Sequence, residues 1–460
     1  MRNQSKWLVC AALAAVFVAG AQDVIVKITG GTLPKLAVPD FRGAGESARF
    51  MDAFNKTLFG DLDSSGLFQM AAKSFYPLEV PQQPEDFRPP LPPVSSKKGS
   101  PGRPVRQGPW LTDWSGPPVS ATHLAFGYAA AQDAQIVLSG WLFDVRGDQV
   151  SGAQLLGKRY FGPLSDQGAR KVAHEFAADI IAKFGGASLL GSKIYFVSDR
   201  TTSKEIWSMD PDGSNQKPFT SYKSITITPS GSPDGTKLAF TTYARGNPGI
   251  FIHSLETGRR LLFFSPNASM NATPSFTPDG QRVLYSSTVS GSGWAQIYIA
   301  NADGGQAQRL TQSRAIEVEP KVSPKGGEVV FVSGRSGMPQ IYKMTLDGAS
   351  AERLTSGEGE ATNPAWHPNG QVIAFSWSRG YEPGNFNVFI MDVATRRSDQ
   401  LTHGAGRNEN PTWAPDGRHI VFASTRSGSS QIWTMLADGT RVQRLTTQGR
   451  NTMPVWVKRD

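Results

Sequence analysis

The side chains that could carry acid–base or metal chemistry are few and scattered along this sequence of 460 residues. Its six histidines include no closely spaced pair of the kind that holds a metal, so we expect each to be a surface or packing residue. Glu358 and Glu360 form a close acidic pair that could do acid–base work, although their Gly-rich surroundings favour a solvated loop. No Gly-x-Ser-x-Gly nucleophile elbow and no Gly-x-x-x-x-Gly-Lys phosphate loop is present. We therefore predict a protein without catalytic residues, metal or cofactor.

The composition indicates a globular chain with an excess of basic residues. Hydrophobic residues make up 39% and charged residues 18%, which is enough apolar surface to bury a core. Lys and Arg number 47 against 38 Asp and Glu, a formal net charge of +9. Because no nucleic-acid recognition motif accompanies this charge, we expect it to favour an anionic envelope surface and no nucleic acid. The single cysteine excludes a disulfide framework.

The first 21 residues are typical of an export signal. Two basic residues precede an uncharged apolar run from residue 7 to 19, which is short for a membrane span. Residues 19–21 form the small-x-small pattern that a signal peptidase accepts. We predict cleavage after Ala21, export to the periplasm and a mature chain that starts at Gln22; a retained membrane anchor is the alternative.

A repeat fills the sequence from about residue 187. Pro-Asp-Gly turns or close variants begin at residues 233, 278, 324, 368 and 415, at spacings of 45, 46, 44 and 47. Such a period, filled with short apolar segments, is typical of the blades of a β-propeller. The regular position of each Asp fits turn chemistry, in which Asp bonds the backbone and Gly takes a positive φ, better than a carboxylate array.

Each repeat predicts four strands joined by tight turns. A Pro-containing strand such as 363–366 comes first, and the Pro-Asp-Gly turn leads from it into an apolar strand such as 329–332. Ser-x-Arg-x-Gly follows, then a Gln-Ile-aromatic strand such as 340–342. An Asp-Gly hairpin turn leads into a last strand that ends Arg-Leu-Thr, as at 353–355.

The count of blades is six. Residues 194–197 align with 238–241, so another blade precedes the first Pro-Asp-Gly turn. That blade lacks its own innermost strand, which residues 453–456 at the C-terminal end can supply. The ring would then be closed by the last strand and would expose no sheet edge. The predicted fold class is mainly β, with a six-bladed β-propeller of WD40-like repeats.

The region before the repeat predicts a small α/β domain. The expected strands are 36–41, 67–70 and 134–144, and the expected helices are 46–61 and 168–184. The apolar alternation slips at Gly140, which predicts a β-bulge there. Twelve of the 32 prolines lie between residues 77 and 118, which predicts an extended loop, either a solvated linker or a basic tether for an anionic partner. The expected domains are the signal peptide at 1–21, the α/β domain at 22–186 and the propeller at 187–460.

The loops that lead into the innermost strands are polar and varied, as expected for a protein-docking face beside the propeller axis. Ordinary polar loop chemistry is the alternative. The candidate docking residues are Met270, Asn271, Glu317, Glu319, Glu360, Thr362, Asn363, Asn408, Glu409, Asn451 and Thr452.

The sequence resembles the TolB family, the periplasmic propeller component of the Tol–Pal system. The resemblance rests on the signal peptide, the Val-Pro strand at 37–41, the segment 61–68, the helix at 173–185 that leads into the first blade, and the six-blade repeat. It implies a non-enzymatic adaptor that supports outer-membrane integrity and constriction during division. It also implies that the lipoprotein Pal binds to the propeller face and the inner-membrane protein TolA to the mature N-terminal segment.

By this resemblance, the first mature residues form an arm that contacts TolA. Val24 and Val26 alternate with Ile25 and Lys27, so the arm could add a strand to the edge of a partner's sheet. The arm consists of Gln22, Asp23, Val24, Ile25, Val26 and Lys27.

Two other functions remain open. One is a propeller enzyme acting on envelope polysaccharide, but such lyases usually hold a histidine-rich metal site that this sequence does not offer. The other is a generic exported propeller that binds a ligand such as a glycan. Pal-like and TolA-like genes beside this one would favour the adaptor.

Overall fold

The computed structural model describes residues 33–91 and 105–458, which form two compact units that divide between Leu190 and Gly191. The predicted signal peptide, the predicted arm from Gln22 to Lys27 and the middle of the Pro-rich segment lie outside the described residues. Each unit contains hydrophobic clusters of its own.

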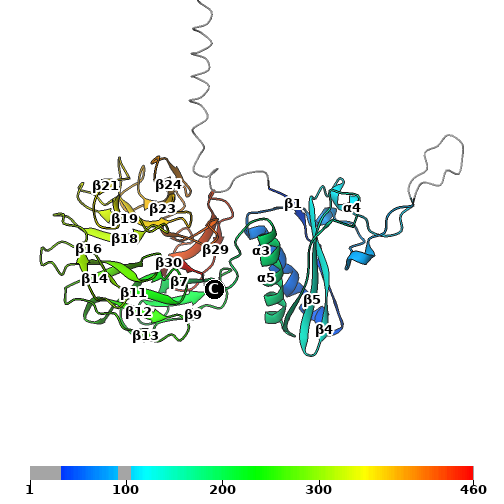
Figure 1. Ribbon diagram of the computed structural model, residues 1–460, viewed down its shortest axis with the longest axis horizontal. Coiled ribbons are helices and arrows are strands. Elements are labelled where there is room, and N and C mark those ends of the chain that lie inside the picture. The colour runs from blue at the N-terminus through cyan, green and yellow to red at the C-terminus, as the bar shows by residue number, and fades with distance from the viewer. Residues whose placement is uncertain (1–32, 92–104, 459–460) are drawn as a thin grey trace, which may run out of the picture. The chain divides into compact units, whose positions relative to one another are not determined.

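One six-stranded sheet forms the centre of the first unit (Figure 1). Its strands are β1 (Lys35–Ala37), β2 (Arg42–Ala44), β3 (Gln69–Met70), β4 (His123–Gln132), β5 (Gln135–Asp144) and β6 (Gln154–Pro163). The order is β3-β1-β4-β5-β6, and β2 also pairs with β4. The short strands run parallel to their neighbours, whereas β4, β5 and β6 pair antiparallel.

Two helices cover one face of this sheet. They are α3 (Met51–Ser64), which follows the 3-10 turn η1 (Gly45–Phe50), and α5 (Asp166–Lys183). Phe54 of α3 and Phe176 of α5 lie in one buried cluster with residues of β1, β4, β5 and β6. The helices predicted at 46–61 and 168–184 are confirmed, except that the first turn of the earlier one is a 3-10 turn.

The β-bulge predicted at Gly140 is wrong. β5 pairs regularly with both neighbours at this residue, and the register shift against β6 lies between Leu142 and Phe143. Apolar side chains occupy both faces of β5, because the helices cover one face and the Pro-rich segment covers the other. A Cβ at Gly140 would lie 3.0 Å from the ring of Phe176, so the glycine makes room for that ring.

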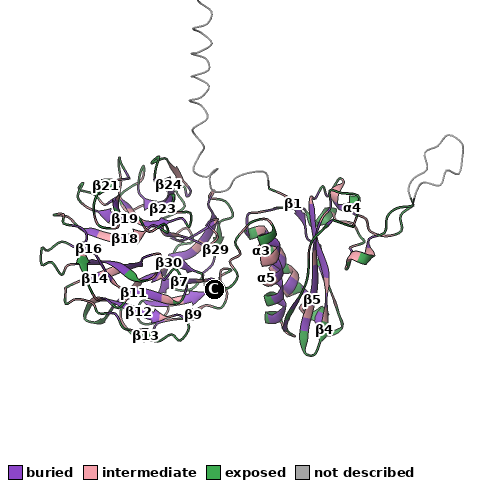
Figure 2. Cartoon of the chain, in the orientation of Figure 1, coloured by how far each residue is buried: buried purple, intermediate pink, exposed green. Residues whose placement is uncertain are grey.

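The described parts of the Pro-rich segment pack on the second face of the sheet and are not a solvated linker (Figure 2). Phe87, Leu111 and Trp114 are buried, and the Phe87 ring stacks on Phe143 of β5 with centroids 5.7 Å apart. The aromatic side chains among the prolines supply the apolar area that holds this segment to the sheet. One short helical turn, η2 (Lys73–Phe75), precedes this segment. Two more, η3 (Pro84–Asp86) and α4 (Thr112–Ser115), lie within it.

The second unit consists of six four-stranded antiparallel sheets (Figure 1). Its strands are β7 (Lys193–Ser198), β8 (Glu205–Met209), β9 (Lys217–Pro218), β10 (Thr226–Gly231), β11 (Lys237–Arg245), β12 (Asn247–Ser254), β13 (Arg260–Leu261), β14 (Asn271–Phe276), β15 (Arg282–Ser287), β16 (Gln296–Asn301), β17 (Gln308–Arg309), β18 (Glu317–Val322), β19 (Glu328–Ser333), β20 (Gln340–Thr345), β21 (Glu352–Arg353), β22 (Ala361–Trp366), β23 (Val372–Trp377), β24 (Asn387–Asp392), β25 (Ser398–Gln400), β26 (Asn408–Trp413), β27 (His419–Ser424), β28 (Gln431–Leu436), β29 (Gln443–Arg444) and β30 (Asn451–Val457). Five blades follow the chain order from β10 to β29, four strands each.

The first blade has the order β30-β7-β8-β9, so the C-terminal strand is its innermost strand. The pairing runs from Asn451 opposite Ser198 to Val457 opposite Lys193. The innermost strands of successive blades contact one another around the ring. The predicted six-bladed propeller and its closure by the last strand are therefore confirmed.

The Pro-Asp-Gly tripeptides act as turns, as predicted. Asp234 Oδ1 accepts a hydrogen bond from the Thr236 N–H at 3.1 Å, and Asp416 Oδ1 accepts one from the Arg418 N–H at 2.9 Å. The glycine of each turn has a positive φ, between 64° and 83°. These carboxylates are thus engaged within their own turns.

Candidate functional site

The first residue of each innermost strand is buried, and in four blades its side chain ties that strand to the second strand of the blade. Asn271 Oδ1 accepts a hydrogen bond from Ser287 Oγ at 2.7 Å, and Asn408 Oδ1 accepts one from Ser424 Oγ at 2.8 Å. We call Thr226, Asn271, Glu317, Asn408 and Asn451 the latch residues; they are at most 3% exposed, and Ala361 takes this place in the fifth blade. Four predicted docking residues, Asn271, Glu317, Asn408 and Asn451, are therefore latch residues whose side chains lie inside the blades.

Arginines of the Ser-x-Arg motif join three of these latches; in the first blade Arg200 Nη2 donates to Asn451 Oδ1 at 3.4 Å, and its guanidinium lies 4.9 Å from the centroid of the Trp207 ring. Arg335 Nη2 lies 3.1 Å from Glu317 Oε1, and Arg426 Nη2 donates to Asn408 Oδ1 at 2.9 Å. The guanidiniums of Arg335 and Arg426 each lie 5.0 Å from the centroid of an aromatic ring on the third strand of the blade. The recurrent Ser-x-Arg therefore serves the packing of the blade.

Two residues after each latch position, the innermost strand has a kink. The residue there has a φ between 49° and 55°, a proline follows it, and the pairing with the second strand shifts register at this point. A left-handed conformation outside glycine costs about 1–2 kcal/mol, so its repetition in every blade implies a compensating arrangement. We call these residues the kink ring: Thr228, Thr273, Glu319, Asn363, Asn410 and Met453.

Hydrogen bonds between blades supply that compensation. Thr273 Oγ1 accepts the N–H of Glu319 at 3.3 Å, and Glu319 Oε2 accepts the N–H of Asn363 at 2.7 Å. Ser376 Oγ accepts the N–H of Asn410 at 3.1 Å. Thr241 Oγ1 accepts the N–H of Thr273 at 3.1 Å, so in four of the kinks the backbone N–H is bonded by a side chain of the preceding blade, and these bonds link blades two to six.

Glu319 carries the strongest of these links. Its Oε1 also accepts a hydrogen bond from Asn363 Nδ2 at 3.1 Å. Burial raises the pKa of Glu319 above its ordinary value, although the Asn363 N–H and the nearby Lys321 ammonium oppose this. Burial also lowers the pKa of Lys321, an effect that the Glu319 carboxylate opposes. Each charge therefore offsets part of the effect that burial has on the pKa of the other, although both side chains are half-buried.

The other predicted docking residues keep part of their side chains accessible. Met270, Glu360, Thr362, Glu409 and Thr452 are all half-buried. Their strands begin where the second strands end, since Asn271 pairs with Ser287 and the same pattern holds in each blade. We call this end of the propeller the leading face.

The leading face also exposes apolar side chains that the sequence analysis did not select. They come in pairs from the second, third and fourth blades, at loops before innermost strands and at hairpins between second and third strands. We call them the apolar arc: Ile225, Tyr243, Val289, Trp294, Ile316 and Met338, each 36–50% exposed. Glycine, small polar and charged residues make up most of the corresponding loops elsewhere, and one charged pair there joins Arg407 to Glu409 at 2.8 Å. The face therefore combines an apolar sector with a polar one.

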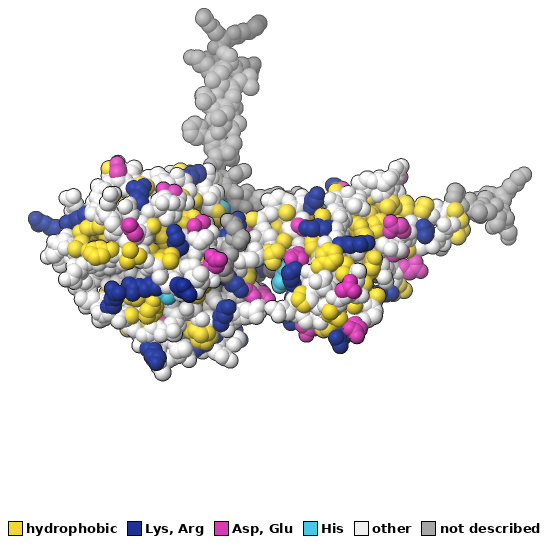
Figure 3. Space-filling model, turned by 60° about the horizontal axis from the view of Figure 1, so that its bottom comes forward, with side chains coloured by type: hydrophobic (Ala, Val, Ile, Leu, Met, Phe, Trp, Pro, Cys, Tyr) yellow, Lys and Arg dark blue, Asp and Glu magenta, His cyan; other side chains and the backbone are white. Residues whose placement is uncertain are grey.

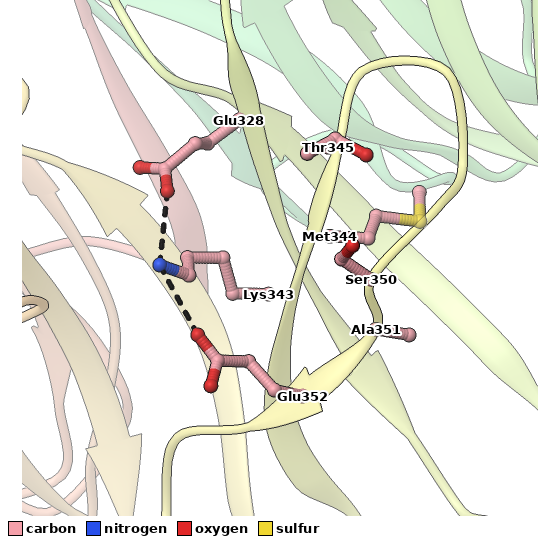
Figure 4. A pocket seen from close by; sticks show the side chains of 7 residues that line it. All are labelled: Glu328, Lys343, Met344, Thr345, Ser350, Ala351 and Glu352. Atoms are coloured by element: carbon pink, nitrogen blue, oxygen red, sulfur yellow. Dashed lines mark ion pairs between the residues drawn. The ribbon is translucent and has the colours of Figure 1, made fainter.

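A hollow on the fourth blade is lined by β19, β20 and the turn into β21 (Figure 4). Lys343 Nζ lies between two carboxylates, 2.9 Å from Glu328 Oε1 and 3.2 Å from Glu352 Oε1. Burial alone would lower the pKa of Lys343, but these two partners raise it. Arg396 of the next blade also pairs with Glu352. The charges in this hollow are paired and hold the outer strand, so they offer no free acid or base.

The buried histidines have packing partners. Tyr222 Oη lies 2.6 Å from His253 Nε2, and His367 Nε2 lies 2.8 Å from the Gly417 carbonyl oxygen. Within residues 33–91 and 105–458, no group of three or more His, Cys, Asp or Glu side chains is placed to hold a metal ion. Over that same part of the chain, no helix combines the length and apolar character needed to cross a membrane.

The comparison with protein families concerns the second unit. The family model described as the TolB beta propeller domain matches residues 184–380 and 356–460, which is more than half of the chain. Its span includes every strand from β7 to β30.

Curated relatives match over part of their length. The protein TolB homolog of Chlorobium chlorochromatii is 37% identical over 218 residues, 47% of this chain and 47% of the relative. The Tol-Pal system protein TolB of Bordetella pertussis is 37% identical over 201 residues, 42% of this chain and 44% of the relative. The chain thus spans about half the length of the curated relatives it matches.

A solved structure is similar over most of the chain. The crystal structure of TolB from Acinetobacter baumannii has a TM-score of 0.73 with 23% sequence identity, and covers 93% of this chain and 97% of that chain. At this identity the likeness shows the shared fold.

Proposed function

Because the chain belongs to the TolB β-propeller family, we propose that it is a non-enzymatic periplasmic adaptor of the Tol–Pal system. It would bind a Pal-like peptidoglycan-associated lipoprotein through the propeller and a TolA-like inner-membrane protein through its N-terminal segment. In this role it would support outer-membrane integrity and constriction during cell division. The Bordetella relative is named a Tol-Pal system protein, which supports this proposal.

The leading face is the proposed docking surface for the Pal-like partner. The observation that carries this proposal is the apolar arc, whose side chains are exposed beside half-buried polar residues of the same face. Protein interfaces favour such a combination, with Trp, Tyr and Met enriched at the centre and polar residues at the rim. Met270, Glu360, Thr362, Glu409 and Thr452 would contact the partner directly.

The remaining predicted docking residues would act through the backbone. The latch residues hold the start of each innermost strand, and the leading-face loops enter the blade at that point. Glu319 and Asn363 join neighbouring blades at the kink ring. Asn271, Glu317, Asn408, Asn451, Glu319 and Asn363 would therefore set the shape that the partner meets.

The state of several candidate acids and bases supports the proposed non-enzymatic role. The Pro-Asp-Gly carboxylates bond their own turns, and the carboxylates around Lys343 are paired. A general acid or base must be within reach of a substrate proton, which these groups are not free to provide.

A calorimetric titration of the full chain with the periplasmic domain of the Pal-like protein of the same organism tests the main proposal. We expect a dissociation constant of about 1 µM or tighter, as for a stable docking interface. Absence of heat and of any shift in melting temperature, with both proteins folded, would refute Pal binding. A screen of envelope glycans would then test the polysaccharide alternative.

The N-terminal arm, Gln22 to Lys27, needs a separate test because it lies outside the described residues. If the arm adds a strand to a TolA-like partner, the double variant Val24→Asp/Val26→Asp should lose TolA binding and keep Pal binding. Ile25→Asp, on the opposite side of the alternation, is the matched control and should have a smaller effect. Equal loss in both variants would argue against strand addition.

A further inference from the structure

The outer strand of the second blade departs from the pattern of its neighbours. In the third, fourth and sixth blades it ends Arg-Leu-Thr, with the Leu buried and the Thr Oγ1 accepting an N–H of the third strand. The second blade instead has Leu262, Phe263 and Phe264, of which Phe263 alone is buried. Ser265 Oγ takes over the hydrogen bond, 3.4 Å from the N of Ile250. Two large apolar side chains therefore stand where these three blades carry Arg and Thr.

These two side chains project from the rim of the propeller. Leu262 is 82% exposed and Phe264 is 69% exposed, so neither lines a groove. The backbone N–H of Phe264 donates to the Asp303 carbonyl oxygen at 2.7 Å, which fixes the segment on the next blade. Their exposure is not required by the blade, because three other blades do without it. Exposed apolar side chains in such a setting indicate an interaction surface.

Arginines surround this apolar pair. The guanidinium carbons of Arg245 and Arg260 lie 5.4 Å and 3.6 Å from the centroid of the Phe251 ring. β13 pairs Arg260 with His253 and Leu261 with Ile252, and Leu262 follows directly after this strand, two residues from Arg260. Arg259 is exposed beside them.

Among the residues that the structure describes, no carboxylate forms an ion pair with Arg245, Arg259 or Arg260. Burial and the neighbouring Arg245 lower the pKa of Arg260, with Tyr222 as the opposing influence. Glu256 is exposed in the turn before β13, and in the next blade the Asp303 side chain accepts the Gly305 N–H at 2.9 Å. An anion placed between the guanidiniums would relieve their mutual repulsion.

We propose that this group of residues binds the anionic headgroups of a membrane leaflet. The group, here called the rim patch, consists of Arg245, Arg259, Arg260, Leu262 and Phe264. The guanidiniums would contact lipid phosphates, and Leu262 and Phe264 would enter the boundary between headgroups and acyl chains. This inference goes beyond the proposed adaptor function and does not depend on it.

The shape of the surface favours a membrane over an acidic peptide. A peptide is usually bound in a groove with pockets for its side chains, whereas Leu262 and Phe264 stand out from the rim. Basic residues flanking protruding apolar ones suit a flat anionic layer. Figure 3 shows Lys and Arg side chains of the propeller lying directly beside hydrophobic ones on one face of the molecule.

Co-sedimentation of the full chain with lipid vesicles tests this proposal. Vesicles of phosphatidylcholine with phosphatidylglycerol should retain the protein, pure phosphatidylcholine should retain much less, and added salt should weaken binding. Arg245→Gln/Arg260→Gln should reduce partitioning about thirtyfold, because each basic residue near an anionic surface contributes about a fivefold factor. Leu262→Gln/Phe264→Thr should reduce it about tenfold or more by removing the inserted side chains.

Matched variants keep the comparison specific. Arg314→Gln/Arg444→Gln removes the same charge from other blades, and Leu155→Gln/Phe161→Gln removes exposed apolar side chains from β6 of the first unit; both should bind like the wild type. Every variant keeps the same N-terminal segment, so any lipid affinity of that segment contributes equally to all the measurements. Hydrogen exchange should slow at residues 256–266 when anionic vesicles are added.

Three results would overturn the proposal. The first is equal binding to both vesicle types, and the second is unchanged binding by the two rim-patch variants when they are folded. The third is binding of a labelled Asp- and Leu-rich peptide at the rim patch without any binding to vesicles, which would assign the surface to an acidic protein partner instead.

Discussion

Asn408 and Glu409 are neighbours in sequence but belong to different regions of the propeller. Asn408 is buried and bonded to Ser424 and Arg426, whereas Glu409 is half-buried and pairs with Arg407 on the leading face. The same contrast recurs in other blades, where a latch residue precedes a more accessible one. A step of one residue along a strand thus separates a residue that holds the blade from one that can meet a partner.

The two regions also invert the usual distribution of side chains. The latch residues are polar and buried, and their side chains are hydrogen-bonded to their own blade, to its arginine or to the preceding blade. The apolar arc is hydrophobic and exposed, and the blades do not use it for their cores. Because buried polar networks are costly to break and exposed apolar residues are not, stability should depend on the first region and binding on the second.

The largest expected effect comes from breaking one latch. Asn408→Ala should lower the free energy of unfolding by about 3 kcal/mol, since it leaves the Ser424 hydroxyl and the Arg426 guanidinium without their buried acceptor. Urea unfolding measures this change. A loss below about 0.5 kcal/mol would show that the latch is dispensable, as surface substitutions usually are.

The second-largest loss of stability is expected from a substitution in the kink ring. Glu319→Gln should cost about 2 kcal/mol, because it weakens charge-assisted hydrogen bonds to Asn363 and removes the countercharge of Lys321. Thermal unfolding measures it, with Glu360→Gln on the leading face as the control. If both variants melt alike, the carboxylate at Glu319 does not hold the blades together.

A smaller effect is expected from pH. His367 Nδ1 accepts the Asn369 N–H at 3.0 Å while Nε2 faces the Gly417 carbonyl oxygen, so this histidine is neutral when folded. Burial lowers the pKa of His367 below its ordinary 6.5. The unfolded chain therefore binds the proton more readily, and stability present above pH 6.5 is lost as the pH falls below it. Unfolding curves of His367→Gln should show a weaker loss; an unchanged pH profile would contradict this.

The smallest effect should come from the ion pair at the surface. Glu409→Ala breaks the pair with Arg407, whose side chain is 50% exposed. Exposed pairs contribute little, so the free energy of unfolding should change by less than about 1 kcal/mol. The difference in the free energy of unfolding between this variant and Asn408→Ala measures how differently the two neighbouring residues contribute to stability. Equal losses in the two variants would contradict this difference.

The fold was predictable where the sequence repeats. Five turn tripeptides at a nearly constant spacing, together with the match of residues 453–456 to the other innermost strands, predicted six blades and their closure. The bulge at Gly140 was not predictable, because both faces of β5 are covered and the glycine fits a ring from a distant helix.

The candidate docking residues lie at one end of the blades, but the sequence did not show which of them are buried inside the blades. The kink before each proline changes the phase of the strand, so alternation alone could not tell which of Asn408 and Glu409 points inward. The apolar arc had a weak sequence signal, since Ile225 and Ile316 are single apolar residues in polar loops just before innermost strands. Whether such residues are exposed depends on packing between blades.

A titration with the Pal-like periplasmic domain tests most directly whether the apolar arc is the docking surface. Trp294→Ala/Ile316→Ala should weaken binding at least about tenfold with no change in melting temperature, as expected for central interface residues. Glu409→Ala, at the polar part of the same face, should weaken it less. Wild-type affinity in the Trp294→Ala/Ile316→Ala chain would contradict the assignment of the leading face.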